Sequence, residues 1–244
     1  MFMKMNFGKI FLMVILNIFF AKIGYALNSN DQLADKVENA INNHYRNEFE
    51  VTANDNNSVT IEGMVKTYYD KLRIFQIVSK VKGVRTIVDN VRVDAPILPD
   101  KEIQSNIVNE LKRVSSILEP ERIEVSVDNG EVILRGKVSF YREKLMAQTV
   151  ASWEKGVKGI TNNIIVLPPA KAVSDSNLKI ILNGILYDQF PVEKNVFFTI
   201  NNGIVDLNGS VNSLYAKKRI EDEFSSIIGI VEVNNNLTVK QFSS

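Results

Sequence analysis

The sequence holds few of the side chains that catalyse reactions or bind metals. It has no cysteine and a single histidine, His44, so it offers neither a histidine pair for a metal nor a histidine-based or thiol-based nucleophile. It contains no nucleophile-elbow or glycine-rich phosphate-loop motif, and its carboxylates are scattered among polar positions rather than paired. We therefore expect a binding protein that is not an enzyme and uses no metal or cofactor. His44 is expected to be exposed near the end of a helix.

Basic residues carry the spacing that best fits binding. Lys71, Lys144 and Lys217 recur every 73 residues, one turn into each of three segments with helical spacing. Cations at a helix start oppose the macrodipole, so helix stability does not explain them. They are either a solvated face or a contact for an anionic phospholipid surface, which attracts Lys and Arg. The lipid-binding candidates are Lys71, Arg73, Lys80, Lys82, Arg142, Lys144, Trp153 and Lys155.

Several large apolar residues stand at positions expected to face outward. Trp153 is expected either at a membrane interface or against a neighbouring unit of the chain. On the outer sheet faces, apolar residues replace the polar ones of the first unit, and we expect them to be buried between units or against a partner. These protein-interface candidates are Ile133, Ile165, Phe197 and Ile204.

The elements that position these residues are repeated three times. "GVRTIVDNVRV" at 83–93 returns as "GVKGITNNIIV" at 156–166 and "GIVEVNNNLTV" at 229–239, which indicates tandem repeats. Proline-bearing stretches at 94–100 and 166–177 read as extended connectors. The expected units are residues 27–95, 100–167 and 174–240.

The middle repeat has the clearest pattern. Apolar residues at steps of three and four predict a helix over 101–118, namely Ile103, Ile107, Leu111, Val114 and Leu118. Alternation on both sides of Asp128-Asn129-Gly130 predicts a β-hairpin, and 141–155 returns to helical spacing. The stretch that ends at Val166 adds a third strand. The fold class is therefore α+β: three αββαβ units, each a three-stranded sheet with two helices on one face.

Nine recurring glycines and asparagines are interpreted as structural. One glycine of each repeat is expected to end the second strand, a second to follow the second helix with a positive φ, and an asparagine to bond local backbone at a turn or bulge. In that order they are Gly63, Gly136 and Gly209, then Gly83, Gly156 and Gly229, then Asn90, Asn163 and Asn236.

These features resemble the BON domain, a small periplasmic module found in osmotic-stress and nodulation proteins. The residues that carry the resemblance are "NSVTIEGMV", "NGEVILRGKV" and "NGIVDLNGSV", together with the three recurring endings. The tandem arrangement is similar to that of exported, osmotically inducible members. The resemblance implies an αββαβ fold, association with phospholipid surfaces, and a part in envelope integrity or assistance to exported proteins. It implies no reaction.

The first 26 residues have the order of a secretory signal peptide. Lys4 and Lys9 precede an apolar run from Ile10 to Phe20, and small residues stand at Gly24 and Ala26. An uncleaved amphipathic anchor is the alternative. Without a cysteine the protein is not expected to be a lipoprotein, and we expect it in the periplasm. Cleavage would move the formal charge from +1 to −2, which gives no case for nucleic-acid binding.

Two functions remain, beside a third reading in which the repeats pack on one another and bind through some other surface. The first is a non-catalytic periplasmic protein that binds anionic phospholipid surfaces and supports envelope integrity under stress. The alternative is a protein-binding module, a chaperone or assembly scaffold for exported or outer-membrane proteins, that uses apolar sheet faces. The sequence leaves the oligomeric state open.

Overall fold

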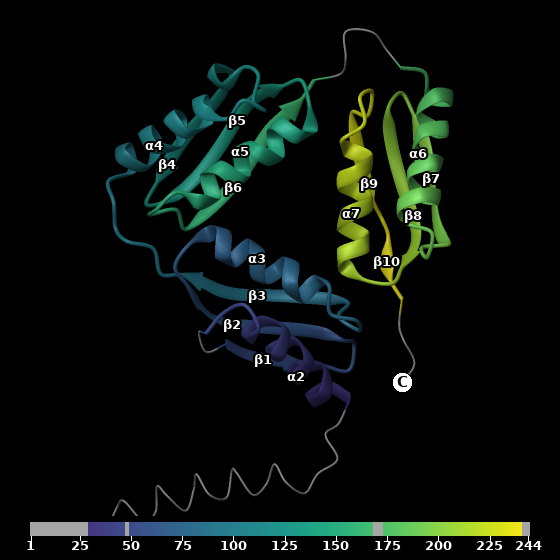
Figure 1. Cartoon of the computed structure of the whole chain (residues 1–244), viewed down its shortest axis with the longest axis horizontal. Coiled ribbons are helices and arrows are strands. Elements are labelled where there is room, and N and C mark those ends of the chain that lie inside the picture. Colours follow the sequence, from purple (N-terminus) through teal and green to yellow (C-terminus); the bar gives the residue numbers. More distant parts are fainter. Residues whose placement is uncertain (1–28, 47–48, 168–172, 241–244) are drawn as a thin grey trace, which may run out of the picture.

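Three repeats make up the described part of the chain. The computed structural model describes residues 29–46, 49–167 and 173–240, and the predicted signal peptide lies outside them. Each repeat packs two helices on one face of a small sheet (Figure 1). The α+β class and the order helix, strand, strand, helix, strand are confirmed in all three repeats.

The elements of the three repeats correspond one to one. The first repeat comprises α2 (Ser29–Asn42), β1 (Phe49–Ala53), β2 (Ser58–Val65), α3 (Tyr68–Ser79) and β3 (Thr86–Val93). The second comprises α4 (Asp100–Arg113), the 3-10 turn η1 (Pro120–Arg122), β4 (Ile123–Asp128), β5 (Glu131–Val138), α5 (Tyr141–Trp153) and β6 (Gly159–Val166). The third comprises α6 (Asp175–Gln189), β7 (Asn195–Asn201), β8 (Ile204–Val211), α7 (Leu214–Ser225), β9 (Glu232–Asn235) and β10 (Thr238–Val239).

The second strand is the centre of each sheet. It pairs antiparallel with the first strand and parallel with the third, as β5 does with β4 and β6. A parallel pair needs a crossover, and the second helix supplies it. In the third repeat the last strand is split into β9 and β10, which both pair with β8, whereas one continuous strand was predicted. The third strand of each repeat is therefore a sheet edge.

Each repeat has its own apolar core. In the second repeat Ile103, Ile107 and Leu111 of α4 pack on the inward residues of β5. The predicted helix over 101–118 is too long, because α4 ends at Arg113. Val114 leaves the helical conformation at ψ 105°, so the phase of the pattern changes there. Ile117 is consequently buried and Leu118 exposed.

The hairpin turns are tied to the first helices. Asn129 and Gly130 both have positive φ, as a tight turn requires. Asp100, the first residue of α4, accepts hydrogen bonds from the backbone N–H groups of both, at 2.8 and 3.0 Å. Asp175 of α6 does the same for Asn202 and Gly203. The first helix and the hairpin of these two repeats are thus fixed to each other.

The recurring strand glycines do not end their strands. Gly63, Gly136 and Gly209 lie two residues inside β2, β5 and β8, with positive φ. A Cβ added to Gly136 would lie 2.0 Å from the backbone oxygen of Arg122. Glycine is therefore required by the close approach of two backbones within the sheet rather than by a strand end.

The recurring glycines after the second helices also have positive φ. The values for Gly83, Gly156 and Gly229 are 105°, 86° and 106°. They do not directly follow the helices, whose C-cap residues are Lys80, Glu154 and Ser226. They stand in the short turn that leads from the helix into the third strand.

Candidate interaction surfaces

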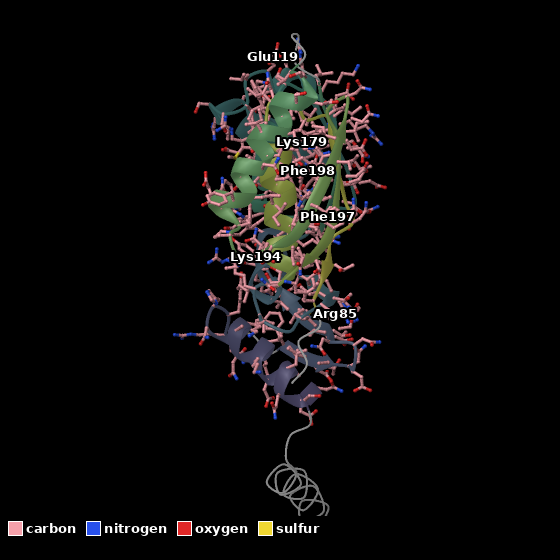
Figure 2. The ribbon with its side chains drawn as sticks, turned by 90° about the vertical axis from the view of Figure 1, so that its right-hand side faces the viewer. Arg85, Glu119, Lys179, Lys194, Phe197 and Phe198 are labelled. Atoms are coloured by element: carbon pink, nitrogen blue, oxygen red, sulfur yellow. The ribbon has the colours of Figure 1, made fainter. Side chains whose placement is uncertain are left out.

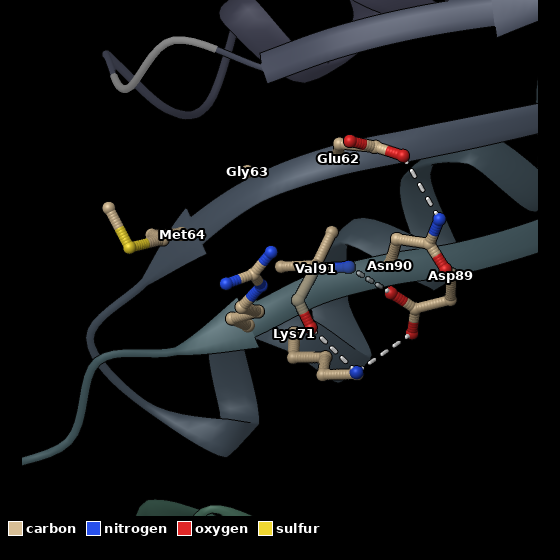
Figure 3. A pocket seen from close by; sticks show the side chains of 8 residues that line it. Glu62, Gly63, Met64, Lys71, Asp89, Asn90 and Val91 are labelled. Carbon is tan, nitrogen blue, oxygen red and sulfur yellow. Dashed lines mark hydrogen bonds and ion pairs between the residues drawn. The ribbon is translucent and has the colours of Figure 1, made fainter.

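The recurring lysine of the second helix is bonded within its own repeat in two of three cases. Lys71 Nζ donates to the carbonyl oxygen of Val91 at 2.7 Å and lies 3.6 Å from the carboxylate of Asp89 (Figure 3). Lys217 Nζ donates to the carbonyl oxygen of Leu237 at 2.6 Å. These two lysines join the second helix to the third strand, which accounts for their position without a ligand.

The residue before each recurring asparagine bonds the backbone. Asp89, Asn162 and Asn235 each accept a hydrogen bond from the N–H two residues further on, at 3.0, 3.2 and 3.2 Å. The neighbouring Asn90, Asn163 and Asn236, for which this role was predicted, are exposed. The amide of Asn90 reaches across the strands to Glu62 (Figure 3). The predicted backbone contact is real but lies one residue earlier in each copy.

The second helices of the three repeats meet in the middle of the molecule (Figure 1). We call this meeting the junction of α3, α5 and α7. The rings of Tyr69 and Trp153 join the first and second repeats edge to face, with centroids 5.8 Å apart. Trp153 therefore packs against a neighbouring repeat, one of its two expected positions, although 55% of its surface stays exposed.

Two further contacts bring the third repeat into the junction. Lys80 Nζ stands 4.7 Å from the ring centre of Tyr215. The hydroxyl of Tyr141 donates to Asp222 at 3.2 Å, and burial is the main cause that raises the pKa of this tyrosine. The exposed basic candidates outside these contacts are Arg73, Lys82, Arg142 and Lys155.

The apolar residues of the outer sheet face of the third repeat are not buried between repeats. Phe197, on the outer side of β7 (Figure 2), is 62% exposed, and Ile204 is 38% exposed. Ile165 is exposed and Ile133 is partly buried. The expectation of burial between repeats is thus wrong for Phe197 and Ile204. The physical reason is that the second helices, α3 with α5 and with α7, make the contacts between repeats, and the bare sheet face of the third repeat takes no part in them.

The outward face of α6 was not singled out in the sequence. Leu178 and Leu182 fill the core, while Ile180, Ile181 and Tyr187 point outward with exposures of 71%, 42% and 81%. Figure 1 shows α6 at the side of the third repeat away from the other two repeats. We call Ile180, Ile181, Gly184 and Tyr187 the α6 outer face.

A comparison between the first helices would have revealed this face. When the buried positions of the three helices are superposed, the same outward places hold Asp35, Lys36, Asn39 and Asn42 in α2. In α4 they hold Ser105, Asn106, Asn109 and Lys112. Only the third repeat places apolar side chains there, so neither the fold nor the core explains them.

A crevice separates the second and third repeats. Two adjoining cavities of about 460 and 450 Å³ share Tyr141, Val166, Ser225 and Ile230 as lining residues. Beyond these, apolar side chains of the edge strands and of the turn after α7 line most of it. They include Ile165, Ile227, Ile228, Val231 and Val233.

Lys144 is the cation of this crevice. Burial, and then the charge of Lys218, hold the pKa of Lys144 below its ordinary value. Lys218 itself is paired with Glu221 at 3.0 Å and Asp222 at 2.9 Å. Within the described part of the chain Lys144 has no ion pair, unlike Lys71 in the same place of the first repeat. The crevice therefore combines apolar walls with the partly desolvated ammonium of Lys144, which has no ion pair among the described residues, and with the carboxylates of Glu221, paired with Lys218, and of Glu232.

The described residues contain no group of three or more His, Asp or Glu side chains that could hold a metal ion. None of the described helices is long and apolar enough to cross a bilayer. His44 lies just beyond the end of α2, exposed, with Nδ1 3.2 Å from the carbonyl oxygen of Ala40. The α6 outer face, the outer sheet face of the third repeat and the crevice can therefore bind a partner through apolar area and charge.

Comparison with known proteins identifies the repeats. The family model described as the BON domain matches three stretches, residues 29–95, 99–168 and 181–241. The chain belongs to the BON domain family. BON domains bind phospholipids or proteins and are generally non-catalytic. The third match begins inside α6, so the start of that helix lies outside the stretch that resembles other BON domains.

Solved structures give more distant likenesses. The C-terminal domain of CdsD, described as the structural protein of the type III secretion system of Chlamydia trachomatis, is 19% identical with a TM-score of 0.24. The match covers 85% of this chain and 97% of that one. The periplasmic domain of the inner-membrane protein PrgH from S. typhimurium is 12% identical with a TM-score of 0.21, over 79% and 93% of the two chains. No curated protein matches the chain.

Proposed function

We propose that this BON protein is a non-catalytic periplasmic protein that associates peripherally with anionic phospholipid surfaces and supports envelope integrity under osmotic or other stress. The observation that carries the proposal is the α6 outer face. An exposed apolar stripe on a peripheral helix binds favourably to a lipid surface, because the stripe is buried at the boundary between headgroups and acyl chains.

The side-chain types of the α6 outer face suit such a boundary. Ile180 and Ile181 supply apolar area, and Tyr187 joins an apolar ring to a polar hydroxyl, as residues at bilayer interfaces do. Exposed Val192 follows shortly after the helix. Transfer of this exposed apolar surface from water into lipid is favourable by roughly 25 cal/mol for each Å² that is buried.

Charge supports a preference for anionic lipid. Lys179 of α6 and Lys194 lie on the same side of the third repeat and are exposed (Figure 2). The exposed candidates Arg73, Lys82, Arg142 and Lys155 add attraction at longer range, which salt screens within about 10 Å. Lys71 and Lys217 contribute less, because their ammonium groups are bonded to their own strands.

Vesicle co-sedimentation of the full chain tests the proposal. We expect binding to vesicles that contain phosphatidylglycerol, stronger than to zwitterionic vesicles and weaker at high salt. The variant Ile180→Ser, Ile181→Asn, Tyr187→Asn gives α6 the outward residue types of its sister helices. It should lower the partition coefficient about tenfold or more, because three apolar side chains no longer leave water.

The matched control is Ile97→Ser. This isoleucine of the connector is 94% exposed, so its removal changes total exposed apolar area without touching α6. It should leave vesicle binding unchanged. Equal binding by the α6 variant and the parent chain would sink the proposal, as would no binding of the parent at low salt.

A protein-binding module is the second candidate, favoured by the exposed outer sheet face of the third repeat. Phe197 and Ile204 offer two separate apolar contacts, toward opposite ends of the β7–β8 ladder, for an exported or outer-membrane protein, as a chaperone or scaffold would need. Replacement of both by serine should then weaken protection of an unfolded client in an aggregation assay and leave vesicle binding intact. The reverse pattern would favour the lipid function alone.

A further inference from the structure

We propose that the crevice between the second and third repeats binds one single-chain amphipathic anion, with its apolar chain along the crevice walls and its carboxylate or phosphate at Lys144. This site is separate from the α6 outer face, so it does not depend on the proposed surface association. It would allow the protein to hold one lipid-derived molecule away from a bilayer.

The shape of the crevice fits a small ligand. Its two cavities, about 460 and 450 Å³, each fall within the usual range of ligand pockets, roughly 300–1,000 Å³. Such pockets occur preferentially where domains meet. Here the walls come from β6 and the start of α5 on one side, and from the end of α7 and β9 on the other. In Figure 1, the third strands of the two repeats border this region.

The walls select an apolar body. Ile165, Ile228 and Val231 line the crevice and remain 58%, 57% and 42% exposed. An aliphatic chain would remove this area from water without asking for hydrogen bonds.

The head group is selected by charge. Lys144 and Lys218 approach each other in this region, and both bear positive charge. Lys218 is neutralised by Glu221 and Asp222, but Lys144 has no ion pair among the described residues and lies in a partly dehydrated place. A partly desolvated charge without a counter-ion is unfavourable, and a ligand anion at hydrogen-bond distance would relieve it. A cationic or neutral head group would not.

The other charged groups at the crevice are already engaged or exposed. Glu221 accepts from the amide of Asn235 at 3.0 Å as well as from Lys218. Glu232 is exposed at the rim. Neither carboxylate forms an ion pair with Lys144 in the described part of the chain, so the place beside its ammonium group is open to a ligand anion.

Calorimetric titration of the full chain separates the possible ligands. Dodecanoate stands for a free fatty acid and dodecyl phosphate for a lipid phosphate, both below their micelle concentrations. We expect one of them or both to bind with a stoichiometry near one, and dodecyltrimethylammonium not to bind. Binding of dodecyl phosphate alone would assign the head group to phosphate, and binding of dodecanoate alone would assign it to carboxylate. Binding of both would show that the site selects negative charge and not one type of head group.

Two variants locate the site. Lys144→Met should weaken binding of the anion about tenfold, the effect of one lost charge-assisted hydrogen bond. Ser225→Phe, which fills the space shared by both cavities, should abolish binding. Lys101→Met removes an exposed lysine of α4, far along the chain from the crevice, and should change nothing.

The outcomes that would overturn the inference are distinct from those that bear on vesicle binding. No heat from either anion, equal binding of the cationic detergent, or equal losses in Lys144→Met and Lys101→Met would each reject the site. If Ser225→Phe does not fold, as judged by circular dichroism, Lys144→Met decides alone. The α6 variant should bind the same anion as the parent chain does, whether or not it still sediments with vesicles.

Discussion

Tyr45 connects the end of the first helix to the start of the second helix in the first repeat. Its hydroxyl donates to Asp70 at 3.2 Å, and Asp70 also bonds the N-cap residue Thr67. Burial, followed by the charge and the hydrogen bond of Asp70, raises the pKa of Tyr45 to about 12. Nothing in the periodicity of the sequence marks this tyrosine, because its role depends on a carboxylate 25 residues away.

This shift predicts a loss of stability in alkali. Since the folded pKa lies above the ordinary value of 10.0, the stabilisation is complete below about pH 10 and is lost as pH rises toward 12. Tyr45 is only half-buried, so solvent screening reduces the effect to about 1 kcal/mol. Tyr45→Phe should therefore flatten, without abolishing, the fall of the urea midpoint between these pH values. Tyr187→Phe, at an exposed position, should retain the full fall, and parallel curves for all three proteins would contradict the assignment.

Strand β5 shows why a glycine recurs at one place in every sheet. Gly136 pairs with Ile123 across the antiparallel ladder, and its φ of 136° is outside the range that side chains tolerate. A methyl group there would meet the backbone oxygen of Arg122, which cannot move without disturbing η1 and β4. The requirement belongs to the pairing of two strands, not to a single turn.

Gly136→Ala should accordingly destabilise the second repeat by about 3 kcal/mol, from strain and displaced backbone together. Gly184→Ala is the matched control, because Gly184 lies inside α6 with no heavy atom within 4 Å of an added Cβ. It should stabilise the chain by about 0.5–1 kcal/mol, the ordinary gain of alanine over glycine in a helix. Urea midpoints measure both, and equal shifts would show that backbone approach is not the cause.

The sequence predicts the elements well because their signals are local. Hairpin alternation, turn residues and the buried steps of the first helices all appear within short windows, and the 73-residue period repeats them three times. Glu143 shows where such reasoning ends. It is buried, and its carboxylate accepts backbone N–H groups of Leu118, Ser139 and Phe140 at 2.9 to 3.0 Å. In the sequence alone, a glutamate that is buried and accepts backbone hydrogen bonds cannot be distinguished from an exposed glutamate on a helix surface.

The candidate surfaces were harder to predict because exposure depends on how whole repeats are arranged. The basic candidates were placed on the second helices, and those helices turn toward the junction, where Lys80 and Trp153 meet aromatic rings. Phe197 stayed in water because the bare sheet face of the third repeat takes no part in the contacts between repeats. The α6 outer face was accessible to sequence comparison between repeats, but only once the buried positions of the first helices fixed their alignment.

At the scale of the whole molecule, few contacts hold the third repeat against the first and second. Besides the Lys80–Tyr215 and Tyr141–Asp222 pairs, Arg85 Nε donates to the carbonyl oxygen of Val239 at 3.2 Å. Leu214 packs against the cores of both the first and third repeats. Each polar or cation–π pair contributes only about 0.5–1.5 kcal/mol. The closed arrangement is therefore stable by a small margin, and it alone creates the crevice.

Removal of two of these contacts should open the arrangement. Tyr215→Ala with Asp222→Ala deletes the ring under Lys80 and the acceptor of Tyr141, a loss of about 1–3 kcal/mol from the contact between repeats, and leaves Lys218 paired with Glu221. Small-angle X-ray scattering should then give a larger radius of gyration, while circular dichroism keeps the signal of folded repeats. Tyr187→Ala with Asp188→Ala removes the same residue types from the outer side of α6 and should leave the scattering unchanged. If the first pair scatters as the parent chain does, the remaining contacts, the Arg85–Val239 hydrogen bond and the packing of Leu214, are enough to hold the third repeat. If it opens and also loses the anion binding of the parent chain, the crevice depends on the closed arrangement.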